Sequence, residues 1–472
     1  MTTATLLVAA VLGAAPRGDD DMRRPNVVLI LCDDLGYGDL GCYGHPVIRT
    51  PHLDGLAAGG VRFTRFYAAS PVCSASRAGL LTGRTPDRAG VYDWIPEGSP
   101  VHLRASEATV PSALAAAGYD CGHFGKWHLN GVFNAPQQPQ PHDHGFRRWF
   151  ATQNNAAPSH RDPHNYVRDG EPVGPLTGYS CDLAVAEAER WLVERATTGD
   201  AGPFFLNLWF HEPHVPIASP PELVAAYRGR SRTELEAAYF ANVANVDRAV
   251  GRLLAFLDER GLRENTLVVF TSDNGPEDRH RYPGAAGAFG SAGGLRGRKL
   301  WLYEGGIRVP GIIHWPGRIR PRVEDVPAGA VDLLPTLCDL TGAAPPDRPL
   351  DGASLAPLLL RGEPVERATP LFWSYYRGLG GPVAAVREGD AVVLARRAGG
   401  GWPSGGNVDA ASLHTLKATE LDRFERYDTR RDPLQHRDLA ASPTLDRLTR
   451  TLIDLHREAR DESPTWSFPP DD

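Results

Sequence analysis

Near its start the chain reads Asn26-Val27-Val28-Leu29-Ile30-Leu31-Cys32-Asp33-Asp34, and this stretch decides the fold class. A short apolar run that stops at polar residues is typical of a strand buried on both faces of a parallel sheet. Three further runs share the pattern: Tyr119 to Phe124, Phe204 to Phe210 and Leu267 to Thr271. Ligands bind beyond the carboxyl ends of the strands in open α/β sheets, so the four runs predict one sheet with one shared site.

Helical patterns lie between these runs, over Thr109 to Ala117, Asp182 to Arg195 and Thr233 to Arg260. From Asn134 to Val173 the chain has little periodicity, which predicts a long loop over the site. Alternating strands and helices predict the α/β class, with a large mixed, mainly parallel sheet sandwiched by helices. The helix from Thr233 carries a stripe of apolar residues at the spacing of a core-facing surface, made up of Leu235, Tyr239, Val243, Val246, Val250, Leu253 and Leu257.

The pattern changes beyond about Pro364. Three short strand-like runs appear there, over Pro370 to Tyr375, Ala384 to Arg387 and Ala391 to Leu394. A terminal helix is predicted after them, from about Thr444 to Arg460. We therefore expect a large domain over residues 22–363 and a smaller C-terminal α+β domain over residues 364–472, with an antiparallel sheet plus a helix.

The first residues contain the apolar run Thr5 to Ala15, which ends in small residues like the core of a secretory signal. No basic residue precedes it, and a start at Met22 would give a chain with no signal. We interpret residues 1–21 as signal peptide and leader, and expect a periplasmic or secreted protein. No apolar run reaches the roughly 18 residues needed to cross a bilayer, so we expect no membrane span.

The net charge of −7 argues against a nucleic-acid partner, which requires a basic face. Any anionic substrate must then be held by local positive charge. Among 50 Lys and Arg residues only Lys126, Lys299 and Lys417 are lysines. A compact ammonium and a planar guanidinium are not equivalent around a small tetrahedral anion, which makes the lysines candidate site residues.

A candidate metal site lies at the ends of two predicted strands. Asp33, Asp34, Asp273 and Asn274 offer three carboxylates and an amide oxygen, which are ligands of calcium or magnesium. An Asp-Asp pair alone is more often a capping or turn feature. The second group at another strand end favours a metal, and the participation of Asn favours calcium over magnesium.

Cys73 lies in Ser70-Pro71-Val72-Cys73-Ser74-Ala75-Ser76-Arg77, which runs on to Thr82-Gly83-Arg84. A helix beginning near Ser74 would aim its free amides at residue 73 and stabilise an anion there. The alternative is a buried structural cysteine.

Together these motifs resemble the sulfatases of the alkaline phosphatase superfamily. Their signature is Cys-x-Pro-Ser-Arg followed by Thr-Gly-Arg, and Ala75 replaces the proline here. The resemblance implies an alkaline-phosphatase-like fold with residues 22–363 as the catalytic domain. It runs from Pro25 to at least Pro316, and its other motifs are Asp33-Asp34, Gly125-Lys126-Trp127-His128, His214-Val215-Pro216, Asp273-Asn274-Gly275 and Leu295 to Pro310.

The resemblance also implies the chemistry. A formylglycine-generating maturation enzyme would convert Cys73 to formylglycine (3-oxoalanine), whose hydrated aldehyde is the nucleophile. One calcium ion would be bound by residue 73 with the four oxygen ligands named above, and a hydroxyl on a divalent cation ionises readily. Arg77 and His128 would hold the hydrate, with His128 as base. Lys126, Lys299 and His214 would surround the sulfate, with His214 as the acid for the departing alcohol.

The segment His144-Gly145-Phe146 with Trp149-Phe150 resembles sulfatases that act on sulfated sugars. We therefore expect a sulfated glycan or a small aryl sulfate ester as substrate. Each polar residue suggested as a substrate contact could equally belong to a solvated loop. These candidates are Asn154, Asn155, His160, Arg161 and His211.

Two other functions stay open from the sequence. One is a phosphate or phosphonate ester hydrolase of the same superfamily, which relative rates on aryl sulfate and aryl phosphate would separate. The other is a non-catalytic glycan-binding protein that kept the fold but is never matured at Cys73.

Overall fold

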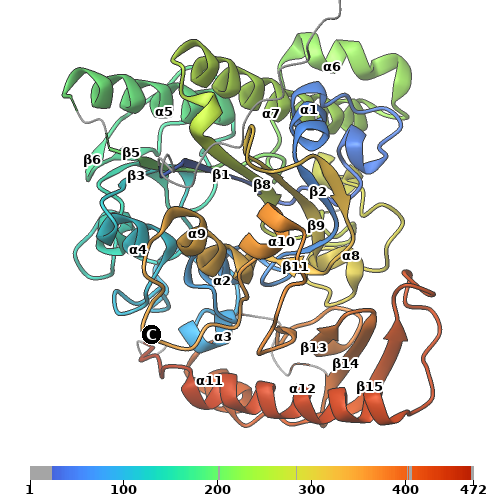
Figure 1. The fold of residues 1–472 in the computed structure, drawn as a ribbon. Coiled ribbons are helices and arrows are strands. Elements are labelled where there is room, and N and C mark those ends of the chain that lie inside the picture. Colours follow the sequence, from blue (N-terminus) through green and yellow to red (C-terminus); the bar gives the residue numbers. More distant parts are fainter. Residues whose placement is uncertain (1–23, 200–201, 283, 401, 403–406, 469–472) are drawn as a thin grey trace, which may run out of the picture.

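The computed structural model describes residues 24–199, 202–282, 284–400, 402 and 407–468. Figure 1 shows a large central sheet with helices on both faces and a smaller sheet beside it. The interpretation of residues 1–21 as a signal and leader lies outside the described residues. None of the described helices combines the length and the apolar character that a membrane span requires.

The large sheet contains the four predicted strands at its centre. They are β1 (Asn26–Cys32), β3 (Asp120–Lys126), β7 (Phe204–Trp209) and β8 (Thr266–Ser272). β1 lies between β7 and β8 and is parallel to both, and β3 is parallel to β7. Their carboxyl ends therefore open on the same edge of the sheet, which places the residues that follow them close together.

Seven further strands extend this sheet to eleven among the described residues, in the order β10-β2-β9-β8-β1-β7-β3-β4-β5-β6 with β11 paired to β2. β9 is antiparallel to both β2 and β8, so the sheet is mixed. The predicted loop from Asn134 to Val173 is wrong in part, because β4, β5 and β6 lie within it. The bounds are β2 Val61–Tyr67, β4 Arg148–Thr152, β5 Val167–Arg168, β6 Glu171–Pro172, β9 Arg308–His314, β10 Arg322–Glu324 and β11 Ala328–Gly329.

Helices cover both faces of this sheet (Figure 1). Val28 and Ile30 of β1 belong to the core shared with α1 (Pro51–Gly59), α5 (Ser180–Thr197) and α7 (Glu234–Glu259). Val27, Leu29 and Leu31 belong to the opposite core, shared with α2 (Cys73–Thr82), α4 (Val110–Ala116) and α9 (Leu333–Thr341). The other helices are α3 Pro86–Ala89, α6 Pro221–Tyr227, α8 Glu304–Ile307, α10 Ala356–Arg361, α11 Ala410–Lys417 and α12 Pro443–Glu462.

The predicted helix from Thr233 forms as α7, and the Thr233 side chain caps it by accepting from the amide of Glu236. Its apolar stripe is buried from Tyr239 to Leu257. Leu235, in the first turn, is instead 44% exposed, because it precedes the part of the helix that reaches the core.

The C-terminal part forms a four-stranded antiparallel sheet with α12 packed on one face. Val386, Val393, Leu448 and Leu452 form its core. The strands are β12 Leu371–Ser374, β13 Pro382–Glu388, β14 Ala391–Arg397 and β15 Leu421–Asp428. This confirms the predicted fold class, a large mixed, mainly parallel sheet between helices with a smaller α+β part. The domain boundary after residue 363 stays a proposal.

Candidate active site

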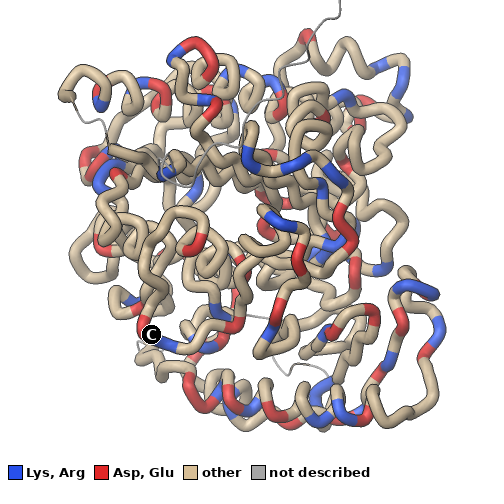
Figure 2. The backbone as a smooth tube through the Cα atoms, in the orientation of Figure 1, with Lys and Arg blue, Asp and Glu red and all other residues tan. Residues whose placement is uncertain are grey.

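Acidic, basic and imidazole side chains meet at the carboxyl edge of the large sheet. Asp33 and Asp34 follow β1, and Asp273 and Asn274 follow β8. Lys126 is the last residue of β3, and His211 and His214 follow β7. Figure 2 shows basic and acidic residues interspersed along the described chain. Positive charge for an anionic substrate must therefore come from the basic side chains of the site itself.

Three carboxylates face three cations at this edge. Lys126 Nζ lies 2.6 Å from Asp33 Oδ2, and Lys299 Nζ lies 2.6 Å from Asp34 Oδ1. Arg77 bridges the two strand ends, with Nη2 3.0 Å from Asp33 Oδ2 and 2.8 Å from Asp273 Oδ2. The charges of these six groups cancel, so an added divalent cation would give the cluster the positive charge that an anionic substrate needs.

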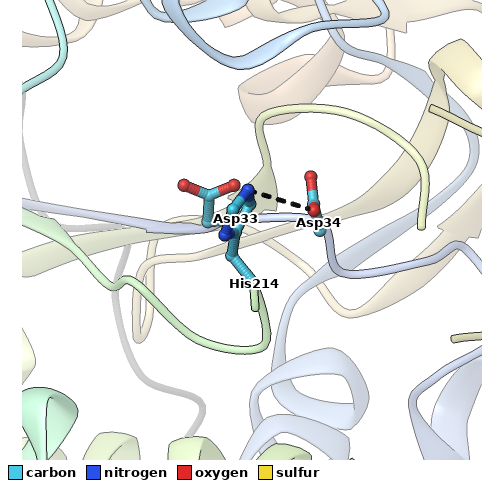
Figure 3. Close-up of side chains that lie close together, drawn as sticks. All are labelled: Asp33, Asp34 and His214. Atoms are coloured by element: carbon cyan, nitrogen blue, oxygen red, sulfur yellow. Dashed lines mark ion pairs between the residues drawn. The ribbon is translucent and has the colours of Figure 1, made fainter. Parts of the chain in front are cut away.

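The cluster also holds oxygens that have no hydrogen-bond partner among the described residues. They are Asp33 Oδ1, Asp34 Oδ2 and Asn274 Oδ1, all buried. Buried polar atoms are normally paired, and three unpaired hard oxygens are the donor set that calcium takes. Figure 3 shows His214 beside the same carboxylates, with Nε2 3.7 Å from Asp34 Oδ2. The residues present therefore fit a bound calcium ion.

Burial and neighbouring charges together set the pKa values of these carboxylates. The ammonium of Lys126 is the main group that holds the pKa of Asp33 well below its usual range, against the effect of burial. Burial raises the pKa of Asp273 to about 7, and the nearby negative charge of Asp33 adds to the shift. Three carboxylates this close favour a cation, because it would stabilise their ionised forms together.

Cys73 is the first residue of α2, one residue earlier than the sequence predicted. It is 3% exposed and lies at the helix end where free amides favour negative charge. Burial raises the pKa of its thiol to about 11, although Lys126 and Lys299 oppose the shift. An unmodified Cys73 would thus be a protonated thiol at neutral pH, which is a weak nucleophile.

Cys73 opens into a cavity of about 220 Å³ that several predicted site residues share. His128 presents a buried Nδ1 with no hydrogen-bond partner among the described residues, while its Nε2 lies 3.1 Å from the carbonyl oxygen of Ile95. An imidazole with one nitrogen fixed and the other unpaired can hold a hydroxyl. The cavity is lined by Val72, Cys73, Trp94, His128, Asn154, Asn155, His214, Arg281, Tyr282 and Lys299.

Three of the suggested substrate contacts lie outside this lining. His211 and His160 are fully buried, and His211 Nε2 lies 2.7 Å from Thr152 Oγ1. The side chain of Arg161 is 58% exposed and lies 3.3 Å from Asp162. Asn154 and Asn155 do line the cavity. The roles of all five in substrate binding stay predictions.

The sequence reasoning missed Trp94, Arg281 and Glu277. Glu277 Oε2 lies 3.6 Å from Lys299 Nζ, and its Oε1 lies 3.3 Å from Arg281 Nη1. Glu277 follows Asp273-Asn274-Gly275 by two residues, a spacing that could have drawn attention to it. Trp94 carries no such signal, because only long-range packing brings its loop to the cavity.

Comparison with known proteins gives one consistent family. The model of the Sulfatase family matches residues 25–343. Arylsulfatase A of Homo sapiens is 39% identical over 82% of this chain and 76% of its own length. N-acetylgalactosamine-6-sulfatase of Homo sapiens is 34% identical over 93% of this chain and 86% of its own length.

A solved structure shares the fold over nearly the whole chain. The crystal structure of Ps i-CgsB in complex with k-i-k-neocarrahexaose superposes with a TM-score of 0.79 at 27% identity, over 95% of this chain and 96% of that one. The family match covers well over half of the chain, and the similarity to the two curated relatives extends over most of it. The chain belongs to the sulfatase family, and it is a sulfuric ester hydrolase.

Proposed function

We propose that this enzyme removes sulfate from a sulfated carbohydrate or an aryl sulfate, with formylglycine at position 73 and one bound calcium ion. The observation that carries the proposal is the position of Cys73. It lies at a helix N-terminus, on the floor of a cavity whose other walls hold Lys299, His128 and His214. Its own thiol is poorly suited to attack sulfur, which favours a modified residue there.

Formylglycine, once formed, supplies a hydrated aldehyde, with one hydroxyl to attack sulfur and a second to release sulfate. Arg77 fixes the surrounding carboxylates through its contacts with Asp33 and Asp273. The unpaired Nδ1 of His128 is suited to hold a hydroxyl of the hydrate and to take its proton. The chain's own residues thus position the nucleophile before the substrate arrives.

A calcium ion would be held by Asp33, Asp34, Asp273, Asn274 and the oxygen at position 73. Its charge would lower the pKa of that hydroxyl and help to hold the substrate anion. The support for calcium is the set of three buried oxygens that have no hydrogen-bond partner among the described residues. Lys126 and Lys299 neutralise two of the carboxylates and remain close to the cavity.

His214 is our proposed acid for the departing alcohol. Burial lowers its pKa to about 3, and the positive charge of Lys299 adds to the shift. A sulfate anion bound in the cavity would oppose both effects and raise the pKa of His214, since a nearby negative charge favours the imidazolium. Proton donation would then depend on a bound substrate.

A sulfated carbohydrate is our proposed substrate class. The curated relatives include an N-acetylgalactosamine-6-sulfatase, and a structural neighbour was solved with an oligosaccharide. Asn154 and Asn155 line the cavity with amide groups that can pair with sugar hydroxyls. We also propose a periplasmic or secreted location, a formylglycine-generating enzyme as maturation partner, and residues 22–363 and 364–472 as the two domains.

Turnover of 4-nitrophenyl sulfate and 4-nitrophenyl phosphate tests this function. We expect the sulfate ester to be hydrolysed with the higher kcat/KM, in a calcium-dependent way. A preference for the phosphate ester would favour the alternative of a phosphate or phosphonate hydrolase. If protein from the native host keeps an intact thiol at Cys73 and hydrolyses neither ester nor any sulfated sugar, the result favours the glycan-binding alternative.

Replacing Lys299 with Arg is expected to lower kcat/KM on 4-nitrophenyl sulfate by about 100-fold, the usual effect of losing one preorganised charge donor. Its side chain is 2% exposed and its ammonium lies between Asp34 and Glu277, and a larger planar guanidinium cannot take the position of that compact ammonium. Lys417→Arg is the matched control, because that ammonium donates to the carbonyl of Ser463 and Lys417 does not line the cavity. A fully active Lys299→Arg enzyme would show that Lys299 is misplaced in this scheme.

A further inference from the structure

A second, larger cavity adjoins the one that holds Cys73. Its volume is about 710 Å³, and Trp94 and Arg281 line both cavities. Most of its other lining residues come from the C-terminal part of the chain, including the turn between β12 and β13 and parts of β14 and β15. The C-terminal part of the chain therefore forms a wall next to the candidate active site.

The charged residues that line this cavity are basic, although Arg281, Arg377, Arg396 and Arg423 each pair with a carboxylate outside the lining. Five arginines and no acidic residue line it in the part of the chain that the structure describes. The side chain of Arg423 is 66% exposed and lies 3.5 Å from Asp422, and that of Arg396 is 31% exposed and lies 2.7 Å from Glu425. A cleft with one sign of charge concentrates ions of the opposite sign, and guanidinium groups match the geometry of carboxylates and sulfates.

Asp93 holds one wall of this cavity, the turn between β12 and β13 that carries Arg377, in place. Asp93 lies 2.7 Å from Arg377 Nη2 and accepts hydrogen bonds from the hydroxyls of Tyr376, at 2.8 Å, and Tyr375, at 3.3 Å. The Asp93 side chain is only 4% exposed. A buried carboxylate with three partners fixes the orientation of this wall, so the cavity is preorganised.

The two cavities differ in volume, and the smaller one cannot hold a whole oligosaccharide. A space of about 220 Å³ is below the range of roughly 300–1,000 Å³ usual for sites of drug-sized ligands, and it suits a sulfate group with little more than its own ring. The rest of a longer substrate must lie outside it. A further cavity shares Asn154 and Asn155 with the smaller one, and none of the described residues that line it is Lys or Arg. An anionic extension would thus be drawn to the arginine-lined side.

We infer that the arginine-lined cavity binds a second anionic group, a carboxylate or sulfate ester, on a sugar that neighbours the one being desulfated. The substrate is then an acidic oligosaccharide rather than an isolated monosaccharide sulfate or an uncharged lipid sulfate. This inference rests on the proposed function, because it takes the smaller cavity to be where the sulfate ester is cleaved. Aromatic rings of Trp94 and Tyr376 offer flat surfaces to the sugar.

The test measures binding and turnover separately on the matured, calcium-loaded full chain. Calorimetry with a size-defined chondroitin sulfate tetrasaccharide gives Kd for the wild type, for Arg423→Gln and for the double variant Arg396→Gln/Arg423→Gln. Arg431→Gln is the matched control, since Arg431 is 89% exposed on the same part of the chain and lines neither cavity. The same proteins are assayed with 4-nitrophenyl sulfate.

We expect Kd to rise about tenfold for each arginine removed, the usual effect of losing a charge-assisted contact, with Arg431→Gln unchanged. Turnover of 4-nitrophenyl sulfate should change less than about twofold, because this small ester does not reach the arginines. A carboxyl-reduced tetrasaccharide distinguishes a carboxylate from a sulfate ester as the second anion.

Equal Kd values in the wild type and both variants would overturn the inference. So would binding of a fully desulfated and carboxyl-reduced tetrasaccharide as tight as that of the intact one. An enzyme that binds the tetrasaccharide through these arginines but hydrolyses no sulfate ester would contradict the proposed function alone. The single Arg423→Gln variant keeps the test valid if the double variant folds poorly.

Discussion

Replacing Cys73 with Ala is expected to lower kcat/KM on 4-nitrophenyl sulfate by about 10⁴-fold or more, the scale on which enzymes lose rate with their nucleophile. Alanine cannot be oxidised to formylglycine, and no other described side chain in the cavity supplies an equivalent hydroxyl pair. The fold should persist, because loss of one sulfur atom from a residue at the end of α2 removes little packing.

The control for this experiment is Cys42→Ala. Cys42 is only half-buried, its backbone amide donates to Asp54 at 2.7 Å, and it does not line the cavity. We expect the wild type and both variants to have equal melting temperatures, and only Cys73→Ala to lose activity. This result would assign the loss to the missing nucleophile. Substantial turnover by Cys73→Ala would show that the attacking group lies elsewhere.

Replacing Asp34 with Asn is expected to abolish calcium binding and to lower activity by about 10³-fold or more, because a ligand and its charge are lost together. The backbone should tolerate the change. Asp34 has φ 64, a left-handed conformation that Asn adopts as readily as Asp. The substitution therefore removes charge from the cluster without changing its shape.

Calcium-dependent stability gives a readout that does not need turnover. A ligand present at 100 times its Kd stabilises the folded state by about 2.7 kcal/mol, so calcium should raise the melting temperature of the wild type and not of Asp34→Asn. Asp162→Asn is the matched control, with φ 52 and a side chain 48% exposed at the surface. Unchanged turnover in excess chelator would contradict the calcium assignment.

The buried centre of the fold could be predicted from local pattern alone. The run from Asn26 to Cys32 forms β1 with the predicted bounds. A short apolar stretch between polar residues is typical of a buried strand. β9 was missed because Pro310 and Gly311 interrupt its pattern, and a strand interior normally excludes both. Only tertiary contact shows that Gly311 packs against Phe66, where a Cβ would meet that ring at 2.3 Å.

The candidate site could likewise be predicted only in part from the sequence. Asp33 and Asp273 could be placed together because parallel neighbouring strands end at one edge. Arg281 and Trp94 could not, because each lies in a loop whose position depends on contacts distant in the sequence. The arginine-lined cavity had no local signal either, since Arg396 and Arg423 read in isolation as ordinary charged positions of a strand.

The most direct test of the central claim is mass spectrometry of the tryptic peptide Phe66 to Arg77 from active protein made in its native host. The account predicts an aldehyde or its hydrate at residue 73 in place of the thiol. An intact cysteine in fully active protein would contradict it.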